Sequence, residues 1–127
     1  MADTVTYVYS VVAAARRPRI GARVRGLPFA GPTRLLDLDR GIWLVVADVP
    51  IARYSEGAIR KGLSNLEWVS RTAVAHEAVV ESFINATAVL PMKLFTMFAG
   101  DERALEHLRG DRARIDTLLK RVALHHE

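Results

Sequence analysis

The stretch from Ser64 to Phe98 constrains the fold of this chain more than any other, because it predicts a long helix followed by an apolar strand. Ser64 and Glu67 form the pattern of a capping box, in which each side chain bonds a backbone N–H at the start of a helix. Apolar residues then recur at three- and four-residue steps, which is typical of one buried helical face. The predicted buried positions are Leu66, Val69, Ala73, His76, Val80, Phe83 and Ile84. Pro91 cannot continue the helix, so residues 89–95 are predicted to be extended, and the rest of the chain should pack around this unit.

Three strands are predicted before this helix. Residues 4–12 are β-branched and aromatic, and simple alternation places Val5, Tyr7, Tyr9 and Val11 on one face. Residues 33–38 and 42–48 are separated by the turn Asp39-Arg40-Gly41, which is short enough for a hairpin. The second strand of this hairpin is almost continuously apolar, which favours a central position in a sheet.

The remaining segments complete the predicted order β-β-β-α-α-β-α. Residues 13–31 are rich in arginine, proline and glycine and predict a loop. Residues 55–61 predict a short helix with Ser55 as its N-cap, and Asp101 is predicted to cap the last helix, which is weakest at Gly110.

This order predicts an α+β protein with a mostly antiparallel sheet, in the form of a modified ferredoxin-like sandwich. With 127 residues and 50% hydrophobic content, residues 1–127 are expected to form a single domain. The helices are expected to pack on one face of the sheet, which would leave the other face open to water or to a partner.

Composition and motifs argue against catalysis. The chain has no cysteine, so it has no thiolate nucleophile and no disulfide framework, which suits a cytoplasmic protein. No apolar run approaches the roughly 20 residues of a membrane span. His76-Glu77 begins a zinc motif, but Val80 stands where the second histidine is required, so His76 is predicted to be structural. We therefore predict a protein that is not an enzyme and uses no metal and no cofactor.

Nucleic-acid binding is the alternative that the aromatic strands suggest. Tyr7 and Tyr9 share a face and Trp43 lies on another strand, so a sheet of this kind could stack bases. The RNA-recognition signature, however, requires a basic residue, a glycine and several aromatics in one strand, and residues 41–46 offer a single aromatic. We therefore expect no nucleic-acid partner and no membrane partner.

The basic residues are more informative by position than by the net charge of +4. Five arginines occupy a single short segment that contains no acidic residue: Arg16, Arg17, Arg19, Arg23 and Arg25. Arginine pairs bidentately with carboxylates, and loops often carry binding contacts, so we predict that this segment contacts a partner. The alternative is a solvated loop without a binding role.

Several motifs resemble the N-terminal domain of the gas vesicle protein F/L family (GvpF/GvpL). They are Tyr7-Val8-Tyr9-Ser10-Val11-Val12, Gly41 to Pro50 (GIWLVVADVP), Leu66-Glu67-Trp68-Val69, Ala75-His76-Glu77 and Val89-Leu90-Pro91-Met92-Lys93, in order over about residues 5 to 110. The resemblance marks Leu66, Glu67, Trp68, His76, Glu77 and Pro91 as structural motif residues. The chain departs from the family pattern at Ser10, where a glycine is usual, and at Leu94-Phe95, where a Phe-Gly pair is usual.

The resemblance implies a cytoplasmic accessory protein of gas vesicle formation, associated with gas vesicles. It implies a modified ferredoxin-like fold, no catalysis, and binding to the small hydrophobic shell protein and to other accessory proteins. Because most family members carry a second domain, the chain is either a fragment or a single-domain relative. The rival hypothesis is a ferredoxin-like enzyme or small-ligand binder, which a pocket holding buried polar groups would favour.

Overall fold

The computed structural model describes residues 3–21 and 24–124, with side chains described up to residue 123. Its elements, in chain order, are β1 (Thr4–Ala13), β2 (Arg34–Asp37), β3 (Ile42–Pro50), α1 (Ile51–Tyr54), α2 (Glu56–Gly62), α3 (Leu66–Glu81), β4 (Ala88–Pro91), β5 (Met97–Phe98), α4 (Asp101–Gly110) and α5 (Arg112–Leu124). Compared with the predicted order, the structure adds α1 and β5 and divides the last helix after Gly110.

The strands form one antiparallel sheet in the order β2-β3-β1-β4, with β5 also pairing with β1. β1 therefore lies at the centre, with β3 on one side and β4 and β5 on the other. β2 and β3 form the expected hairpin, and Asp39, Arg40 and Gly41 take positive φ angles of 74°, 55° and 75° in its turn. The prediction of an α+β fold with a mostly antiparallel sheet is confirmed, and the arrangement is compatible with a ferredoxin-like sandwich.

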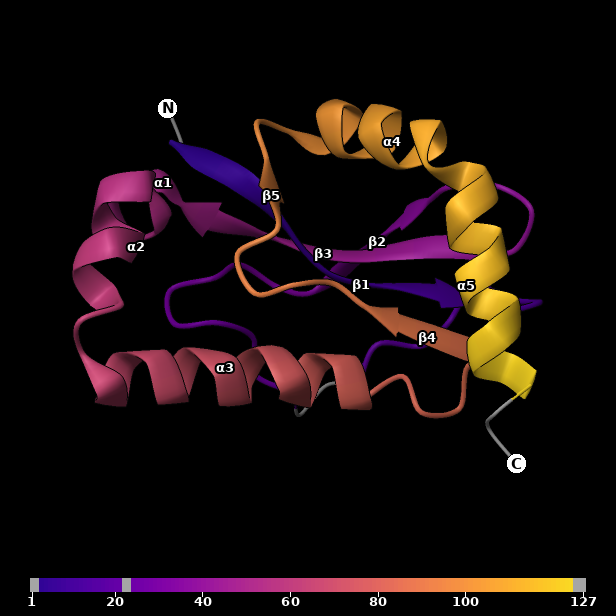
Figure 1. The fold of residues 1–127 in the computed structure, drawn as a ribbon, viewed down its shortest axis with the longest axis horizontal. Coiled ribbons are helices and arrows are strands. Elements are labelled where there is room, and N and C mark those ends of the chain that lie inside the picture. Colours follow the sequence, from indigo (N-terminus) through magenta and orange to yellow (C-terminus); the bar gives the residue numbers. More distant parts are fainter. Residues whose placement is uncertain (1–2, 22–23, 125–127) are drawn as a thin grey trace.

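Helices cover both faces of this sheet, so the expectation that they pack on one face only is wrong. On one face, Tyr7, Val45 and Val49 belong to a core that includes Val79 and Phe83 from α3 and the turn after it. On the other face, a second core joins alternate residues of β1 and β3 to α4 and α5. Its buried members are Val8, Val11, Leu38, Ile42, Leu44, Val46, Ala88, Ala104, Leu108, Ile115 and Leu119. Figure 1 shows α3 running along the sheet and α5, in yellow, crossing it near β4.

A β-bulge in β1 explains why simple alternation misplaces Val11. The register pairs Val8 with Val46 but Ser10 with Val45, so Tyr9 is the extra residue of the bulge. Tyr7, Tyr9 and Val12 consequently share one core, while Val8 and Val11 belong to the other. Ser10, at the bulge, is fully buried, and its Oγ has no hydrogen-bond partner among the described residues.

The long helix begins one residue later than its capping-box pattern indicates. Ser64 Oγ donates to the carbonyl of Lys61 at 2.7 Å and closes α2, so the Ser64 hydroxyl is already engaged. Asn65 is the N-cap of α3, and its side chain accepts from the N–H of Trp68 at 3.2 Å. Ser55, by contrast, caps α2 as predicted.

The buried face of α3 is also rotated relative to the predicted one. Thr72, His76, Val79 and Val80 are the buried residues of the helix. Leu66 is 83% exposed and Ile84 is 68% exposed, so the prediction that they lie on the buried face is wrong. His76 and Val80 are buried as predicted, but the structure buries the polar Thr72 in place of the neighbouring Ala73, which is exposed.

Candidate functional site

The described polar side chains form two contrasting regions, of which the first is buried. Tyr7 of β1 donates its hydroxyl proton to His76 Nδ1 of α3, with 2.7 Å between the oxygen and the nitrogen. His76 Nε2 lies 3.0 Å from the carbonyl oxygen of Met92, which can only accept, so Nε2 carries the proton. The Tyr7 oxygen in turn accepts from the N–H of Phe95 at 3.1 Å. We call Tyr7, His76, Met92 and Phe95 the tyrosine–histidine junction.

The junction ties the central strand to α3 and to the linker between β4 and β5. Burial lowers the pKa of His76 below its ordinary value of 6.5, because the charged imidazolium would lose its hydration. Burial also raises the pKa of Tyr7, and the Phe95 N–H only partly opposes that shift. Both rings are therefore neutral at pH 7, and both nitrogens of His76 are used in internal hydrogen bonds.

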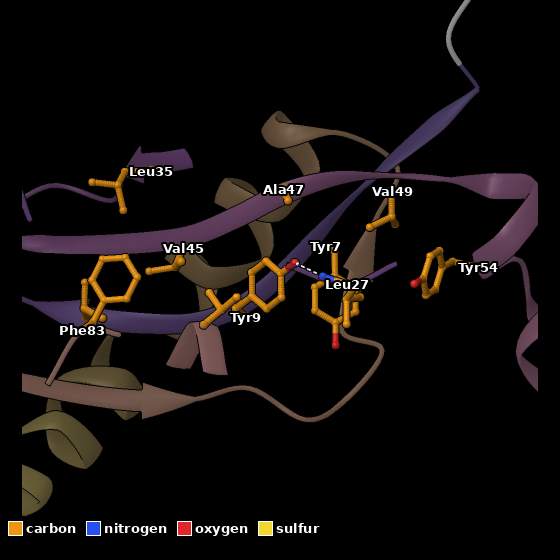
Figure 2. Close-up of a cluster of buried hydrophobic side chains, with 11 residues drawn as sticks. Tyr7, Tyr9, Leu27, Leu35, Val45, Ala47, Val49, Tyr54 and Phe83 are labelled. Atoms are coloured by element: carbon orange, nitrogen blue, oxygen red, sulfur yellow. Dashed lines mark hydrogen bonds between the residues drawn. The ribbon is translucent and has the colours of Figure 1, made fainter. Parts of the chain in front are cut away.

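Tyr9 makes a second buried polar connection beside the junction. Its hydroxyl accepts from the N–H of Leu27 at 3.0 Å, which fixes the loop that follows the arginines (Figure 2). The rings of Tyr7 and Tyr9 lie 4.9 Å apart, and burial raises the pKa of Tyr9 as well. A Cβ atom on Gly26 would lie 2.5 Å from the Tyr9 oxygen, so the loop approaches the tyrosine closely through a glycine.

Trp68 closes the edge of this region. Its ring stacks on Phe95, with centroids 5.7 Å apart and planes 8° from parallel. The ring centroid of Tyr54 lies 6.5 Å from that of Trp68. Phe95 holds this position with a φ of 69°, a backbone conformation that glycine adopts more easily. A glycine at position 95 would fit this backbone conformation, but it would lack the phenyl ring that stacks on Trp68.

An ion-pair network beside Thr6 of β1, on the other face of the sheet from the junction, was not predicted from the sequence. Arg34 bonds Asp101 through both terminal nitrogens at 2.6 and 2.8 Å, and it also bonds Asp48 at 2.6 Å. Thr6 donates to Asp101 at 2.7 Å. The hydrogen bonds from Arg34 lower the pKa of Asp101. Asp101 is therefore the first residue of α4 rather than its predicted cap, and its carboxylate binds Arg34 and Thr6. Gly100 is the N-cap of α4 and makes no side-chain capping bond.

The second region is the arginine segment, residues 16–25, whose described arginines are Arg16, Arg17, Arg19 and Arg25. Arg23 lies outside the described residues. All four described arginines are exposed, and none belongs to an ion pair with a described residue. Arg17 lies over the ring of Trp43, with its guanidinium carbon 5.5 Å from the ring centroid. The segment is therefore attached to the sheet at Arg17 while its other charges face solvent.

The remaining motif residues lie at the surface. Leu66 and Glu67 form the exposed first turn of α3, Glu77 is exposed on the same helix, and Pro91 is exposed at the end of β4. Of the six motif residues, the structure brings only Trp68 and His76 into the region around the junction.

The described part of the chain shows neither a metal-binding cluster nor a membrane-spanning helix. Within it, no three histidine or acidic side chains gather where they could hold a metal ion. None of the helices in the same residues combines the length and apolar character needed to cross a bilayer.

Three features were not predicted from the sequence: the role of the Tyr7 hydroxyl as a hub, the Arg34 network, and the turn after α3 that faces the arginine segment. Arg34 could have been suspected, because a lone arginine beginning a predicted strand requires a carboxylate partner if it is covered. The partner that it binds through two nitrogens, Asp101, is 67 residues away, and no local signal identifies it.

These observations define an α+β protein whose buried polar groups connect its elements and whose arginine segment carries a cluster of exposed positive charges with no ion-pair partner among the described residues. The chain belongs to the gas vesicle synthesis protein GvpL/GvpF family, whose model matches residues 5–127. It is 30% identical over 122 residues to gas vesicle protein L of Streptomyces sp. (strain CB03234). That match covers 94% of this chain and 44% of the relative, so the chain spans less than half of the relative's length. No solved structure matches the chain significantly.

Proposed function

We propose that this chain is a non-enzymatic accessory protein of gas vesicle assembly that acts in the cytoplasm, at gas vesicles, by binding the hydrophobic shell protein and other accessory proteins. Membership of the GvpL/GvpF family over residues 5–127 is the observation that carries the proposal. The 30% identical relative, named gas vesicle protein L, supports the same process. We further propose that residues 1–127 form one α+β domain.

We propose the arginine segment as the partner-binding surface. From Thr4 to Leu36 the chain has no acidic residue, so the positive charges of the segment have no neutralising neighbour in sequence. The contact between Arg17 and Trp43 holds part of the segment against the sheet, which lowers the entropy lost on binding. The sheet face that was expected to be open is covered by helices, so it is a weaker candidate.

The small-ligand or enzyme alternative receives less support from the geometry. It requires a pocket into which buried polar groups point. The buried polar groups Tyr7 and His76 are instead saturated by one another and by backbone, and neither lines a main surface hollow. A general acid or base must have a free nitrogen or oxygen to offer to substrate.

Co-purification tests the proposal. The tagged chain and the gas vesicle shell protein are produced in the same cells, and the chain is purified at low and at high salt. The expected result is co-purification of shell protein that weakens with salt, because exposed charges are screened. An unrelated tagged protein of similar net charge is the control. Equal recovery of shell protein with that control would overturn the proposal.

A further inference from the structure

The arginine segment does not only present charge; it also forms one wall of a surface hollow. The hollow has a volume of about 370 Å³ and lies between residues 14–19 and residues 82–87, the turn that joins α3 to β4. Arg16 and Arg19 line one side of it, and Asn85 and Thr87 line the other. This volume is near the lower end of the range for ligand pockets, about 300–1,000 Å³.

The walls of the hollow are fixed by backbone and side-chain contacts. The N–H of Thr87 donates to the carbonyl of Ala13 at 2.9 Å, which joins the turn to the end of β1. The N–H of Ala14 donates to the carbonyl of Gly41, also at 2.9 Å, and Arg17 packs over Trp43. The two sides of the hollow are therefore attached to the same sheet, and Arg16 and Arg19 lie on either side of an anchored residue.

The lining has a chemical character that suits one kind of occupant. No acidic residue is among the lining residues, and Arg16 and Arg19 have no carboxylate within ion-pair distance among the described residues. Ala15, which is exposed, and Ala86, which is half-buried, contribute apolar surface beside these charges, whereas Phe83 is almost fully buried. A side chain with an aliphatic stem and a terminal carboxylate would use both features, since guanidinium groups bind carboxylates in a forked geometry.

We propose that this hollow is a docking site for a short acidic segment of a partner protein, with Arg16 and Arg19 binding its carboxylates and Arg17 acting as a positioning residue. The proposal rests on the proposed function for its partner, but its test contains no shell protein. Nucleic acid is the less suitable occupant, because Tyr7 and Tyr9 are fully buried and Arg17 already lies over the ring of Trp43. Among the described residues that line the hollow, the one aromatic, Phe83, is also buried, so base stacking has no free aromatic partner there.

The test uses a fluorescein-labelled hexapeptide of alternating glutamate and leucine, with binding measured by fluorescence anisotropy. The wild-type chain is expected to bind it at low salt and not to bind the same peptide with glutamine in place of glutamate. The double variant Arg16→Ser/Arg19→Ser is expected to bind at least about tenfold more weakly, as the loss of charge-assisted hydrogen bonds implies. The matched control, Arg109→Ser/Arg121→Ser, removes two exposed arginines from α4 and α5 and is expected to bind as the wild type does.

Two further variants separate a shaped site from diffuse charge. Ala15→Trp changes no charge but fills the hollow, so it is expected to weaken peptide binding. Arg16→Lys/Arg19→Lys keeps the charge but removes the fork, so its binding should lie between those of the wild type and the serine variant. Thermal melting of each variant checks that it is folded.

Several outcomes would overturn the inference. They are the absence of peptide binding, an equal loss in the arginine control pair, unchanged binding by Ala15→Trp, and equally tight binding of an oligothymidine through Arg16 and Arg19. Self-association of the wild-type chain in sedimentation, abolished by Ala15→Trp, would place a second copy in the hollow and would overturn it too. If the peptide binds as described but shell protein does not co-purify, the docking site stands and the proposed shell-protein partner fails.

Discussion

The tyrosine–histidine junction and the arginine segment lie on the same side of the sheet but differ in whether their polar atoms have partners inside the protein. In the junction, each polar atom of Tyr7 and His76 has a partner inside the protein, and burial keeps both rings neutral. In the arginine segment, the described guanidinium groups are exposed and have no carboxylate partner among the described residues. Saturated polar groups hold a fold together, whereas unsaturated charges are available to another molecule.

The difference suggests separate roles for two regions that are both attached to β1. β1 provides Tyr7, which holds α3 and the linker between β4 and β5, and Tyr9, which holds the loop before β2 at Leu27. After the end of β1 the chain continues into the arginine segment. Under the proposed function, the binding residues follow closely after the central strand, which holds the start of their segment in place. The junction should therefore determine stability, and the arginine segment should determine association.

The largest expected effect on stability comes from Tyr7→Phe. The substitution removes one hydroxyl but leaves two partners without a hydrogen bond, the buried Nδ1 of His76 and the part-buried N–H of Phe95. An unsatisfied buried group costs about 1–3 kcal/mol and a part-buried one less, so we expect a loss of about 2–4 kcal/mol in the free energy of unfolding, measured by urea denaturation. Tyr9→Phe is the matched control, because its hydroxyl has one protein partner, Leu27, and it should cost about half as much. Equal losses for the two variants would contradict the role of Tyr7 as the hub.

Trp68→Ala should have the next largest effect. The ring is half-buried and stacks on Phe95, so we expect a loss of about 2–3 kcal/mol, somewhat below the about 3–5 of fully buried aromatics. Trp68→Phe, which keeps an aromatic ring, should recover most of that loss in the same denaturation experiment. A melting temperature unchanged by Trp68→Ala would mean that the stack contributes little and that Trp68 is available to a partner.

The pH dependence of stability should report on His76. Its pKa in the folded chain is lowered by burial, so the unfolded chain binds more protons at mildly acidic pH. Stability from this group is complete above pH 6.5 and is lost as the pH falls through the lower pKa of the folded state. The pKa of Asp101 is also lowered, so its contribution to stability is lost only as the pH falls below about 3.8.

His76→Gln provides the comparison. This variant should be less stable at neutral pH but should show a smaller change of unfolding free energy between pH 7 and pH 5 than the wild type. Parallel pH profiles for the two proteins would exclude His76 as the titrating group.

The arginines should have the smallest effects on stability, and they should not be equivalent. Arg17→Ser removes a guanidinium from the ring of Trp43, which is worth about 0.5–1 kcal/mol at an exposed site. Arg16→Ser and Arg19→Ser should each remain within about 0.5 kcal/mol of the wild type. Thermal melting of the three variants tests this order, and a greater loss for Arg16→Ser than for Arg17→Ser would reverse it.

Local sequence signals predicted the elements better than the contacts between them. The strands at residues 4–12 and 42–48, the hairpin turn and the Ser55 cap follow from patterns within a few residues, and the structure contains them. The bulge at Tyr9 and the cap at Asn65 were not predictable in this way. A bulge depends on how β3 pairs, and the Ser64 hydroxyl is taken by the end of the preceding helix.

The candidate site was predictable only in its charged part. The arginines are visible in the sequence because they cluster, but the hollow beside them requires the turn at residues 82–87, which the fold brings next to residues 14–19. The role of His76 could be narrowed to a structural one, because Val80 excludes the zinc motif. Its partners, Tyr7 and Met92, lie on other elements, and no spacing rule connects them.

One paired measurement tests the division between the two regions most directly. Shell-protein capture and thermal melting are compared for Tyr7→Phe and for the variant with serine in place of Arg16, Arg17, Arg19, Arg23 and Arg25, with capture measured well below each melting temperature and at low salt. The account predicts that Tyr7→Phe melts at a clearly lower temperature but captures shell protein as the wild type does. The arginine variant should melt close to the wild type and lose capture. Full capture by the arginine variant, or loss of capture by folded Tyr7→Phe, would contradict the account.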